Sequence, residues 1–196
     1  MPAFLDKIPW WIALALLGVA LPHGAASRRS APRAPTPSVI TKIRFVRCHD
    51  GDTCTGKTPE GLLIQLRLLG LDAPEVAPPG SFRRRRSSPP QPYALSSRDE
   101  LCRRVVGRIL PVEIRGSDPY RRYLAIVWDG TRPSGVSINE SLIREGYAFA
   151  YRAKFVDSDI RRWAESAELG AQRDRRGLWG TQEKPLNPSE YRRLMR

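Results

Sequence analysis

Histidine and cysteine are scarce in this sequence, which has two and three of them among 196 residues. Zinc sites in proteins draw most of their ligands from these two residue types, so this chain offers few ligands for a zinc ion. Neither His23 nor His49 has a cluster of matching ligands near it in the sequence, and we assign neither a catalytic role. A metal ion in this protein is therefore expected to rely on oxygen ligands.

Acidic residues are also few, since 20 Asp and Glu face 33 Lys and Arg, for a formal net charge of +13 and a sequence pI near 10.5. This charge exceeds the magnitude of about 2 to 8 that suits the solubility of a small domain. The field of such a protein attracts polyanions or anionic surfaces. Charge alone favours nucleic acid as the partner but does not choose between DNA, RNA and lipid.

Long hydrophobic runs are limited to the stretch from Trp10 to Leu21. Its 12 residues are too few to span a hydrocarbon layer of about 30 Å comfortably. Lys7 precedes the run, and small residues up to Ala26 follow it, as in a secretory signal peptide cleaved after Ala26. We expect residues 1–26 to be a signal peptide, with an uncleaved N-terminal anchor as the alternative. A cleaved protein would be secreted, periplasmic or at the cell envelope, with no stable membrane contact.

Three further segments follow the predicted signal peptide. Residues 27–38 are rich in Pro, Ser, Ala and Arg and predict a solvated linker. Residues 39–180 are long enough for one core, show no internal repeat and are expected to form one domain. Residues 181–196 form a basic tail, whose end from Tyr191 is expected to add an electrostatic contact or to be disordered.

Short runs that alternate apolar and polar residues predict five β-strands, each with one buried face. The predicted strands are residues 39–46, the stretch after Thr53, residues 62–69, residues 111–115 and residues 123–128. Asp50-Gly51 and Glu60-Gly61 supply turn chemistry between the first three strands, and residues 117–120 connect the last two.

Helical spacing predicts three helices in the second half of the domain. The first covers residues 94–107, the second is capped by Ser137 or Asn139, and the third begins at a Ser158 cap. Their apolar positions include Leu95, Leu101, Val105 and Val106 in the first helix and Ile160, Trp163 and Leu169 in the third. This order predicts an α+β fold, mainly β, in which a five-stranded OB-type Greek-key barrel carries about three packed helices.

Two runs of acidic residues lie 15 residues apart (67 − 52), namely DGDT at 50–53 and RLLGLDAPE at 67–75. Carboxylates repel nucleic acid, so a strongly basic chain has reason to gather them if they hold a cation. The short side chains of Asp52 and Asp72 suit an oxygen-loving ion such as Ca²⁺. Taken singly, Asp50-Gly51 could be only a hairpin turn and Arg67 only a solvated strand residue.

Hydrolysis of a phosphodiester adds negative charge to a phosphorus that oxygens already shield. A catalyst therefore needs a hard cation, guanidinium groups and a base for water. The chain offers all three.

Four runs together carry a family resemblance: VRCHDGDT at 46–53, RLLGLDAPE at 67–75, DPYRRYLAIVW at 118–128 and SINESLIREGYA at 137–148. In order and spacing they resemble the thermonuclease family, the staphylococcal-nuclease-like domains, over about residues 39–179. The resemblance implies a Ca²⁺-dependent nuclease that leaves 3′-phosphate ends.

The resemblance also implies a metal site and a base. Asp52, Asp72 and the backbone carbonyl of Ala73 would bind Ca²⁺, and Asp50 would hold waters of the metal. Glu75 would act as general base on the attacking water or orient it. The family usually has Thr where Ala73 stands; a carbonyl ligand survives this loss, whereas the hydrogen bonding around Glu75 is expected to change.

Arg67 and Arg122 correspond to the two catalytic arginines of the family, whose guanidinium groups form paired bonds to phosphate oxygens. Arg121 is adjacent, but the register of Tyr120 within the run places Arg122 at the catalytic position. Tyr120 and Tyr151 would line the nucleotide pocket by stacking or by hydrogen bonding to phosphate. The alternative for both tyrosines is an ordinary surface position.

Four consecutive arginines, Arg83, Arg84, Arg85 and Arg86, lie in a Pro- and Ser-rich stretch shortly after Glu75. Such a run is usually solvated and mobile. It could also gather phosphates over the active site and make binding depend steeply on salt. The two readings are compatible.

Cys48 and Cys54 flank the Asp50–Asp52 turn, and Cys102 lies on the first predicted helix. An odd number of cysteines in an exported protein predicts one disulfide and one leftover thiol. A Cys48–Cys54 disulfide would close a short loop and stiffen the predicted metal turn.

These observations predict an exported, calcium-dependent endonuclease acting on DNA and RNA as a monomer. Little sequence preference is expected, because contacts to backbone phosphates carry no direct sequence information. The main alternative is a nucleic-acid-binding module of the same fold without catalysis, which the retained acids and arginines argue against. A basic adhesin on an uncleaved anchor would leave that acid and arginine pattern unexplained.

Overall fold

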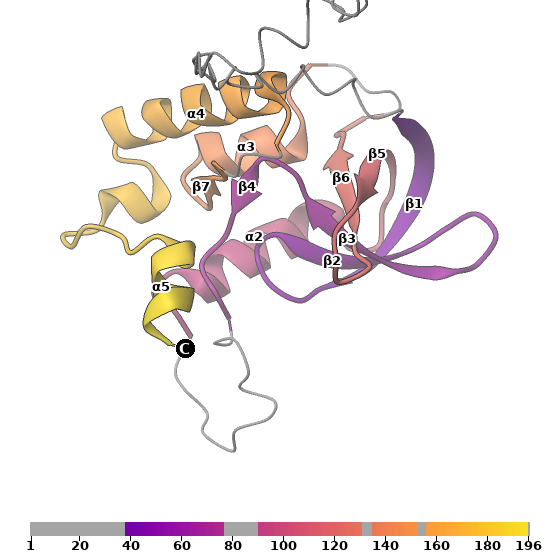
Figure 1. Ribbon diagram of the computed structural model, residues 1–196, viewed down its shortest axis with the longest axis horizontal. Helices are drawn as coiled ribbons and strands as arrows, with labels where there is room; N and C mark the ends of the chain where they lie inside the picture. The colour runs from indigo at the N-terminus through magenta and orange to yellow at the C-terminus, as the bar shows by residue number, and fades with distance from the viewer. Residues whose placement is uncertain (1–37, 77–89, 131–134, 153–155, 196) are drawn as a thin grey trace, which may run out of the picture. The chain divides into compact units, whose positions relative to one another are not determined.

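Five strands close into a barrel in the computed structural model of the chain (Figure 1). The structure describes residues 38–76, 90–130, 135–152 and 156–195, all within one compact unit, Pro35–Arg196. The predicted signal peptide, nearly all of the predicted linker and Arg83–Arg86 lie outside the described residues. None of the helices in the described part is both long and apolar enough to cross a membrane.

The barrel has the strand order β1-β2-β3-β6-β5, and it closes because β1 pairs with both β2 and β5. Its strands are β1 (Val39–Cys48), β2 (Thr53–Lys57), β3 (Leu63–Leu68), β5 (Ile109–Ser117) and β6 (Tyr123–Val127). All neighbours are antiparallel except β3 and β6, which run parallel. The predicted five-stranded barrel is confirmed.

The interior of the barrel is filled from alternate positions of its strands. Ile43 and Phe45 of β1 are buried, while Arg44 between them is exposed. Leu66 and Leu68 of β3 point inward in the same way. Residues two apart on a strand share a face, so one apolar stripe per strand is enough to build this core. Each such buried side chain contributes about 1.5–3 kcal/mol.

A second sheet of two very short strands was not predicted from the sequence. In it, β4 (Leu71–Asp72) pairs antiparallel with β7 (Phe149–Ala150). Gly70, just before β4, has φ of 82°, and a Cβ there would lie 2.6 Å from the Trp163 ring. The turn into β4 therefore requires glycine. The pairing fixes the backbone of Asp72.

The described residues include four α-helices: α2 (Ala94–Val105), α3 (Ile138–Arg144), α4 (Ser158–Arg173) and α5 (Pro188–Leu194), with a short 3₁₀ helix over Gly177–Gly180. The first three correspond to the predicted helices, and α5 was not predicted.

Two details of the predicted helices were wrong. Ser158 begins α4, and Asp157 occupies the N-cap position. Leu169 is 63% exposed, and Leu95 and Val106 are exposed as well. Leu169 is exposed because it lies on the face of α4 opposite the buried residues, which include Ile160, Ala164 and Ala171.

Asn139 joins α3 to the barrel from a fully buried position. Its side-chain oxygen accepts the Val127 N–H at 2.9 Å, and its amide nitrogen donates to the carbonyls of Leu69 and Ala125, both at 2.9 Å. Ser137, rather than Asn139, caps the helix. Asn139 thereby fixes the connection between β3, which carries Arg67, and β4, which carries Asp72. Both residues belong to the site described next.

Candidate active site

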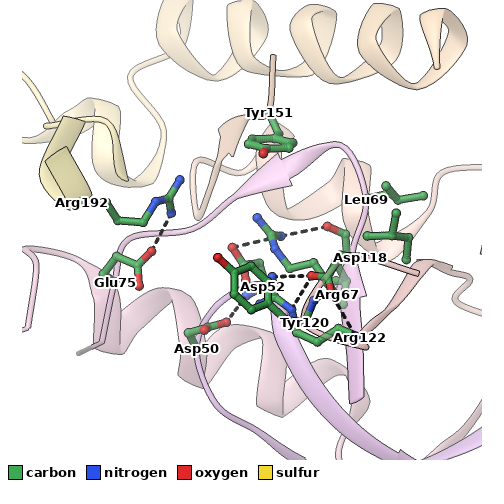
Figure 2. A pocket seen from close by; sticks show the side chains of 12 residues that line it. Asp50, Asp52, Arg67, Leu69, Glu75, Asp118, Tyr120, Arg122, Tyr151 and Arg192 are labelled. Atoms are coloured by element: carbon green, nitrogen blue, oxygen red, sulfur yellow. Dashed lines mark hydrogen bonds and ion pairs between the residues drawn. The ribbon is translucent and has the colours of Figure 1, made fainter. Parts of the chain in front are cut away.

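A cleft of about 580 Å³ gathers acids and arginines that are far apart in the sequence (Figure 2). Its lining includes Asp50, Asp52, Arg67, Glu75, Asp118, Tyr120, Arg122, Tyr151 and Arg192. These side chains come from the β1–β2 turn, β3, the chain after β4, the β5–β6 turn, the chain after β7, and α5.

The turn between β1 and β2 presents Asp50 and Asp52. The Asp50 carboxylate accepts the backbone N–H of Asp52 at 3.0 Å, a local bond typical of aspartate in turns. The carbonyl of Asp52 accepts the Leu68 N–H at 2.8 Å, which ties the turn to β3. Because the Thr53 hydroxyl also donates to Asp52 Oδ1 at 2.9 Å, the Asp52 carboxylate has a fixed orientation.

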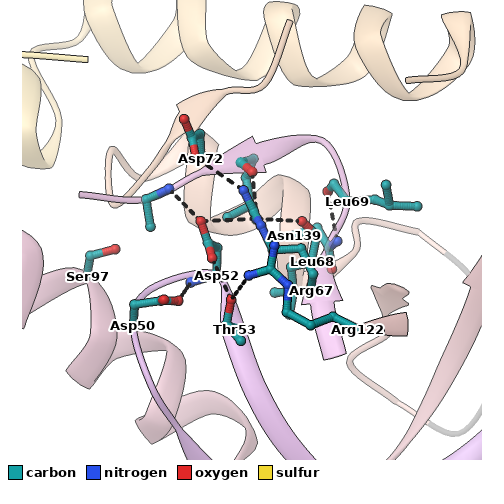
Figure 3. Close-up of polar contacts among 12 residues, drawn as sticks. Asp50, Asp52, Thr53, Arg67, Leu68, Leu69, Asp72, Ser97, Arg122 and Asn139 are labelled. Atoms are coloured by element: carbon teal, nitrogen blue, oxygen red, sulfur yellow. Dashed lines mark hydrogen bonds and ion pairs between the residues drawn. The ribbon is translucent and has the colours of Figure 1, made fainter. Parts of the chain in front are cut away.

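Arg67 on β3 bridges Asp52 and Asp72 (Figure 3). Its Nη1 lies 3.0 Å from Asp52 Oδ2, and its Nη2 lies 3.1 Å from Asp72 Oδ1. Nη1 also donates to the carbonyls of Leu68 and Leu71, both at 3.0 Å. Removing one partner of a buried ion pair costs about 3–5 kcal/mol. The arginine therefore holds together two carboxylates that would otherwise repel each other.

The surroundings of the three aspartates set their protonation. Burial disfavours the charged form of Asp52, but Arg67 and the local N–H and hydroxyl donors bring its pKa below the usual value. Burial and the charge of Asp52 raise the pKa of Asp50 well above its usual value. The pKa of Asp72 is also raised, because burial outweighs its contacts with Arg192 and Arg67. Asp52 is therefore the most readily ionised of the three.

Asp52, Asp72 and Ala73 form an oxygen-rich group. The Ala73 N–H donates to Asp52 Oδ2 at 3.0 Å, which brings the backbone of Ala73 against this carboxylate. Ca²⁺ accepts carboxylates, carbonyls and waters in flexible geometry, so the chemistry of these donors fits it. As they stand, the described residues include no group of three or more His, Cys, Asp or Glu that could hold a metal ion. A cation here would need backbone and water oxygens beside the two aspartates.

Glu75 follows β4 and lies at the cleft, where Figure 2 shows it beside Arg192. Gln91 fixes its backbone, because the Gln91 side-chain oxygen accepts the Glu75 N–H at 3.0 Å. Burial raises the pKa of Glu75, although the contact with Arg192 opposes the shift. A carboxylate with a raised pKa is a better proton acceptor near neutral pH.

Arg122 lines the cleft from the β5–β6 turn. Asp118 holds it twice, since Oδ2 accepts from Arg122 Nε at 2.8 Å and Oδ1 accepts its backbone N–H at 3.0 Å. Arg121 has φ of 64°, the left-handed region, as part of this turn. Nη1 of Arg122 lies 3.3 Å from the Thr53 hydroxyl, so this guanidinium reaches the residue next to Asp52.

The two predicted tyrosines lie over the two arginines. The Tyr120 ring centre is 5.5 Å from Arg122 Cζ, and the Tyr151 ring centre is 5.7 Å from Arg67 Cζ. Both distances are within the range of a cation–π contact. Tyr120 is 80% exposed, so most of its surface is open to a ligand in the cleft.

The structure brings together nearly every residue that the sequence assigned to the site. The residues so placed are Asp50, Asp52, Arg67, Asp72, Ala73, Glu75, Tyr120, Arg122 and Tyr151. Arg83–Arg86 lie outside the described residues.

A sequence profile described as "Staphylococcal nuclease homologue" matches residues 65–181. The chain belongs to this family. "Probable endonuclease LCL3" of Candida tropicalis is 30% identical over 191 residues, which cover 81% of this chain and 77% of that relative. "Thermonuclease" of Staphylococcus hyicus is 31% identical over 140 residues, which cover 69% of this chain and 74% of that relative. "Probable staphylococcal-like nuclease CAN1" of Oryza sativa is 29% identical over 129 residues; the match covers 66% of this chain and only 32% of that relative's length.

Arg192 is a site residue that the sequence analysis missed in this staphylococcal nuclease homologue. It lies on α5, beyond the residues 65–181 that match the family. Its guanidinium contacts Asp72 and Glu75, 120 and 117 residues away in the chain. The available local signal was Asn187-Pro188, a capping residue followed by proline at the first helical position, which begins α5.

Cys48 and Cys54 face each other across β1 and β2 and are free thiols in this structure. Their Sγ atoms are 2.7 Å apart. The hydrogen bond with Cys54 lowers the pKa of Cys48, while burial raises the pKa of Cys54. The disulfide between them stays a prediction. Thiol titration of the unfolded, non-reduced protein would find only Cys102 if the bond forms.

Proposed function

We propose that the protein is a Ca²⁺-dependent nuclease that hydrolyses DNA and RNA with little sequence preference and leaves 3′-phosphate ends. The observation that carries this proposal is the position of Arg67, joined to both Asp52 and Asp72, in a cleft that also holds Arg122 and Glu75. Membership of the nuclease family and the names of the relatives support the same class of reaction.

The proposed metal site consists of Asp52, Asp72 and the Ala73 carbonyl, with Asp50 bonded to waters of the metal. Bound Ca²⁺ would supply Lewis acidity toward a phosphate oxygen and the attacking water. Asp52 has its orientation fixed by Thr53 and by the Ala73 N–H, so this ligand is preorganised. Preorganisation matters because no energy is then spent on reorienting the carboxylate during the reaction.

Arg67 and Arg122 are the proposed catalytic guanidinium groups. Negative charge grows on the phosphate oxygens as the reaction proceeds, and guanidinium groups bind such oxygens in pairs. Arg122 is held by Asp118 and Arg67 by Asp52 and Asp72, so each has its direction set before substrate arrives.

Glu75 is the proposed base. It accepts a proton from the water that attacks phosphorus, and the bond from phosphorus to the 5′ oxygen breaks. The 5′ oxygen takes up a proton and leaves as an alcohol, and the phosphate stays on the 3′ oxygen. The raised pKa of Glu75 supports this assignment, since the carboxylate is then better matched to accept a proton.

Single-stranded nucleic acid is the form of substrate that this cleft suits. Tyr120 and Tyr151 offer rings for stacking, which every base accepts regardless of sequence. The net charge of +13 favours contact with the phosphate backbone. We further propose that Arg83–Arg86 add to this attraction, and that the protein is a monomer exported by means of residues 1–26 to the exterior or the cell envelope.

The test is cleavage of single-stranded DNA by the full chain, with Ca²⁺ or with a chelator, beside Glu75→Gln. We expect Ca²⁺-dependent cleavage to 3′-phosphate ends and a loss of about 10²–10⁴-fold in the variant, the usual contribution of a general base. Glu183→Gln, at an exposed position, is the matched control. Binding without cleavage under every condition would instead identify a non-catalytic nucleic-acid-binding module.

A further inference from the structure

Helix α5 brings a positive charge to two groups that the proposed nuclease needs, Asp72 and Glu75. Arg192 Nη1 lies 2.6 Å from Glu75 Oε1 and 3.1 Å from Asp72 Oδ1, and Nη2 lies 2.8 Å from Asp72 Oδ2. Arg67 Nη2 also lies 3.1 Å from Asp72 Oδ1. A carboxylate has about four lone-pair positions for hydrogen bonds. Both oxygens of Asp72 are therefore already engaged by guanidinium groups.

The position of α5 does not depend on Arg192 alone. Asn187 begins the helix by accepting the backbone N–H of Ser189 at 2.9 Å, and Pro188 occupies its first turn. Tyr191, next to Arg192, is only 5% exposed. Burial of an aromatic ring is a large stabilising contribution, so the helix is anchored by its apolar side.

Gln91 connects the approach to α5 directly with Glu75. Its Nε2 donates to the Leu186 carbonyl at 2.6 Å, while its Oε1 accepts the Glu75 N–H at 3.0 Å. The Gln91 side chain is buried between these two segments. The base and the chain leading into α5 thus share one rigid polar contact, which keeps Arg192 within reach of the site.

We propose that Arg192 is an internal competitor of the metal ion, one that neutralises Asp72 and Glu75 in the metal-free protein and leaves Asp72 when Ca²⁺ binds. This inference rests on the proposed function. The apparent affinity for the metal then equals the intrinsic affinity multiplied by the fraction of molecules in which Asp72 is free of Arg192. Arg192 is accordingly a positioning residue that sets the calcium concentration at which the site is filled.

The test is a calorimetric titration of Ca²⁺ into the full-length protein and two variants, Arg192→Met and Arg193→Met. Methionine keeps an unbranched side chain with good helix propensity and removes the guanidinium. Arg193 is exposed on the same helix, so its variant loses the same charge without the contact to the site. The comparison of the two variants separates the effect of the contact between Arg192 and Asp72 from the effect of lowering the protein's net charge by one.

We expect Arg192→Met to bind Ca²⁺ about tenfold more tightly than Arg193→Met, the factor that corresponds to losing one charge-assisted contact. Arg192→Lys should fall between wild type and Arg192→Met, because it keeps the charge without the paired geometry. Circular dichroism and thermal unfolding in chelator check that α5 is retained. The lysine variant keeps the test decisive if the methionine variant unfolds the helix.

Equal affinity in Arg192→Met and Arg193→Met, or weaker binding in Arg192→Met, would overturn the inference. Cleavage of single-stranded DNA is measured in the same samples. If cleavage depends on Ca²⁺ but the two variants bind Ca²⁺ equally well, only the proposed competition by Arg192 is refuted. If no protein binds Ca²⁺ or cleaves DNA, the proposed function is refuted as well.

Discussion

Gln91 and Glu75 bond each other at two points, although 16 residues separate them in the chain. The Gln91 side-chain oxygen accepts the Glu75 N–H at 3.0 Å, and the Gln91 N–H donates to the Glu75 carbonyl at 2.9 Å. These two bonds join the chain just after β4 to the chain just before α2. The backbone of the proposed general base is therefore fixed independently of its side chain.

Replacing Gln91 with leucine should weaken both the fold and the reaction. The Glu75 N–H and the Leu186 carbonyl lose their partner, and an unsatisfied buried group costs about 1–3 kcal/mol. Urea unfolding should show that loss, and cleavage of single-stranded DNA should fall more in kcat than in KM. Gln182→Leu, at an exposed position, is the control. Wild-type turnover in Gln91→Leu would show that Glu75 needs no such support.

Replacing Asn139 with alanine should cost more stability than any surface change. The variant leaves the Val127 N–H and the Leu69 carbonyl without the partner that Asn139 provides in the core, whereas the Ala125 carbonyl keeps the Leu69 N–H at 2.8 Å. We expect a loss of about 3 kcal/mol in the free energy of unfolding, measured with urea. Asn187→Ala, which removes only a helix cap, should lose about 0.5–2 kcal/mol. Similar losses in the two variants would contradict this account.

The pair of Asp118 and Arg122 should make stability depend on pH in acid. Burial opposes ionisation of Asp118, but hydrogen bonds from the Arg122 backbone and side chain lower its pKa. A group whose pKa is lower in the folded state stabilises the protein above its unfolded pKa of about 3.9. That contribution is lost as pH falls through the lower folded value.

The free energy of unfolding of wild type and Asp118→Asn should therefore differ most above about pH 5 and converge below about pH 4. Urea unfolding at a series of pH values measures the difference. Asp99→Asn changes an exposed acid, and we expect it to differ from wild type by less than about 0.5 kcal/mol. If the difference in the free energy of unfolding between wild type and Asp118→Asn stays constant down to pH 2, Asp118 is not the source of the pH dependence.

Gly51, in the turn between β1 and β2, lies close to Ala73 and to Ser97 of α2. A Cβ at this position would lie 2.7 Å from Ala73 Cβ and 2.9 Å from Ser97 Cβ. Gly51→Ala should therefore push the Asp50–Asp52 turn away from Ala73 and destabilise the fold by about 1–3 kcal/mol. Calcium affinity, measured by calorimetry, should fall with it.

Gly170 provides the opposite case, because it lies within α4 with open space around it. Gly170→Ala should stabilise the protein by about 0.5–1 kcal/mol, since alanine favours the helix. If both alanine variants shift the thermal midpoint in the same direction, the crowding at Gly51 does not govern the turn.

The barrel and its acidic turn were predictable because their signals are local. Alternation along β1 and β3 follows from one buried face per strand, and Asp50-Gly51 is turn chemistry within two residues. The β4–β7 sheet escaped prediction because a strand of two residues has no periodicity. Leu169 was misassigned because it is nine residues after Ile160, which places it on the opposite face of α4 from the buried residues.

The site was predictable as far as it lies in recognisable runs. Asp52, Arg67, Asp72, Glu75 and Arg122 each stand within one of them, so their residue types could be matched to chemistry. Arg192 could not be found in this way, because its partner Asp72 is 120 residues away and no local pattern links them. A seven-residue helix such as α5 also carries little amphipathic signal.

The parallel pairing of β3 with β6 fixes the distance between the two proposed catalytic arginines, Arg67 and Arg122. Arg67 stands opposite Leu124, two positions after Arg122, and the strands on either side hold that register. A connection that carries no site residue, such as residues 58–62 between β2 and β3, can therefore be exchanged for a new recognition surface while the two guanidinium groups keep their spacing. The β1–β2 and β5–β6 turns cannot be exchanged in this way, because they carry Asp52 and Arg122. A single inserted residue inside β3 would instead shift one arginine against the other and reverse its face of the sheet.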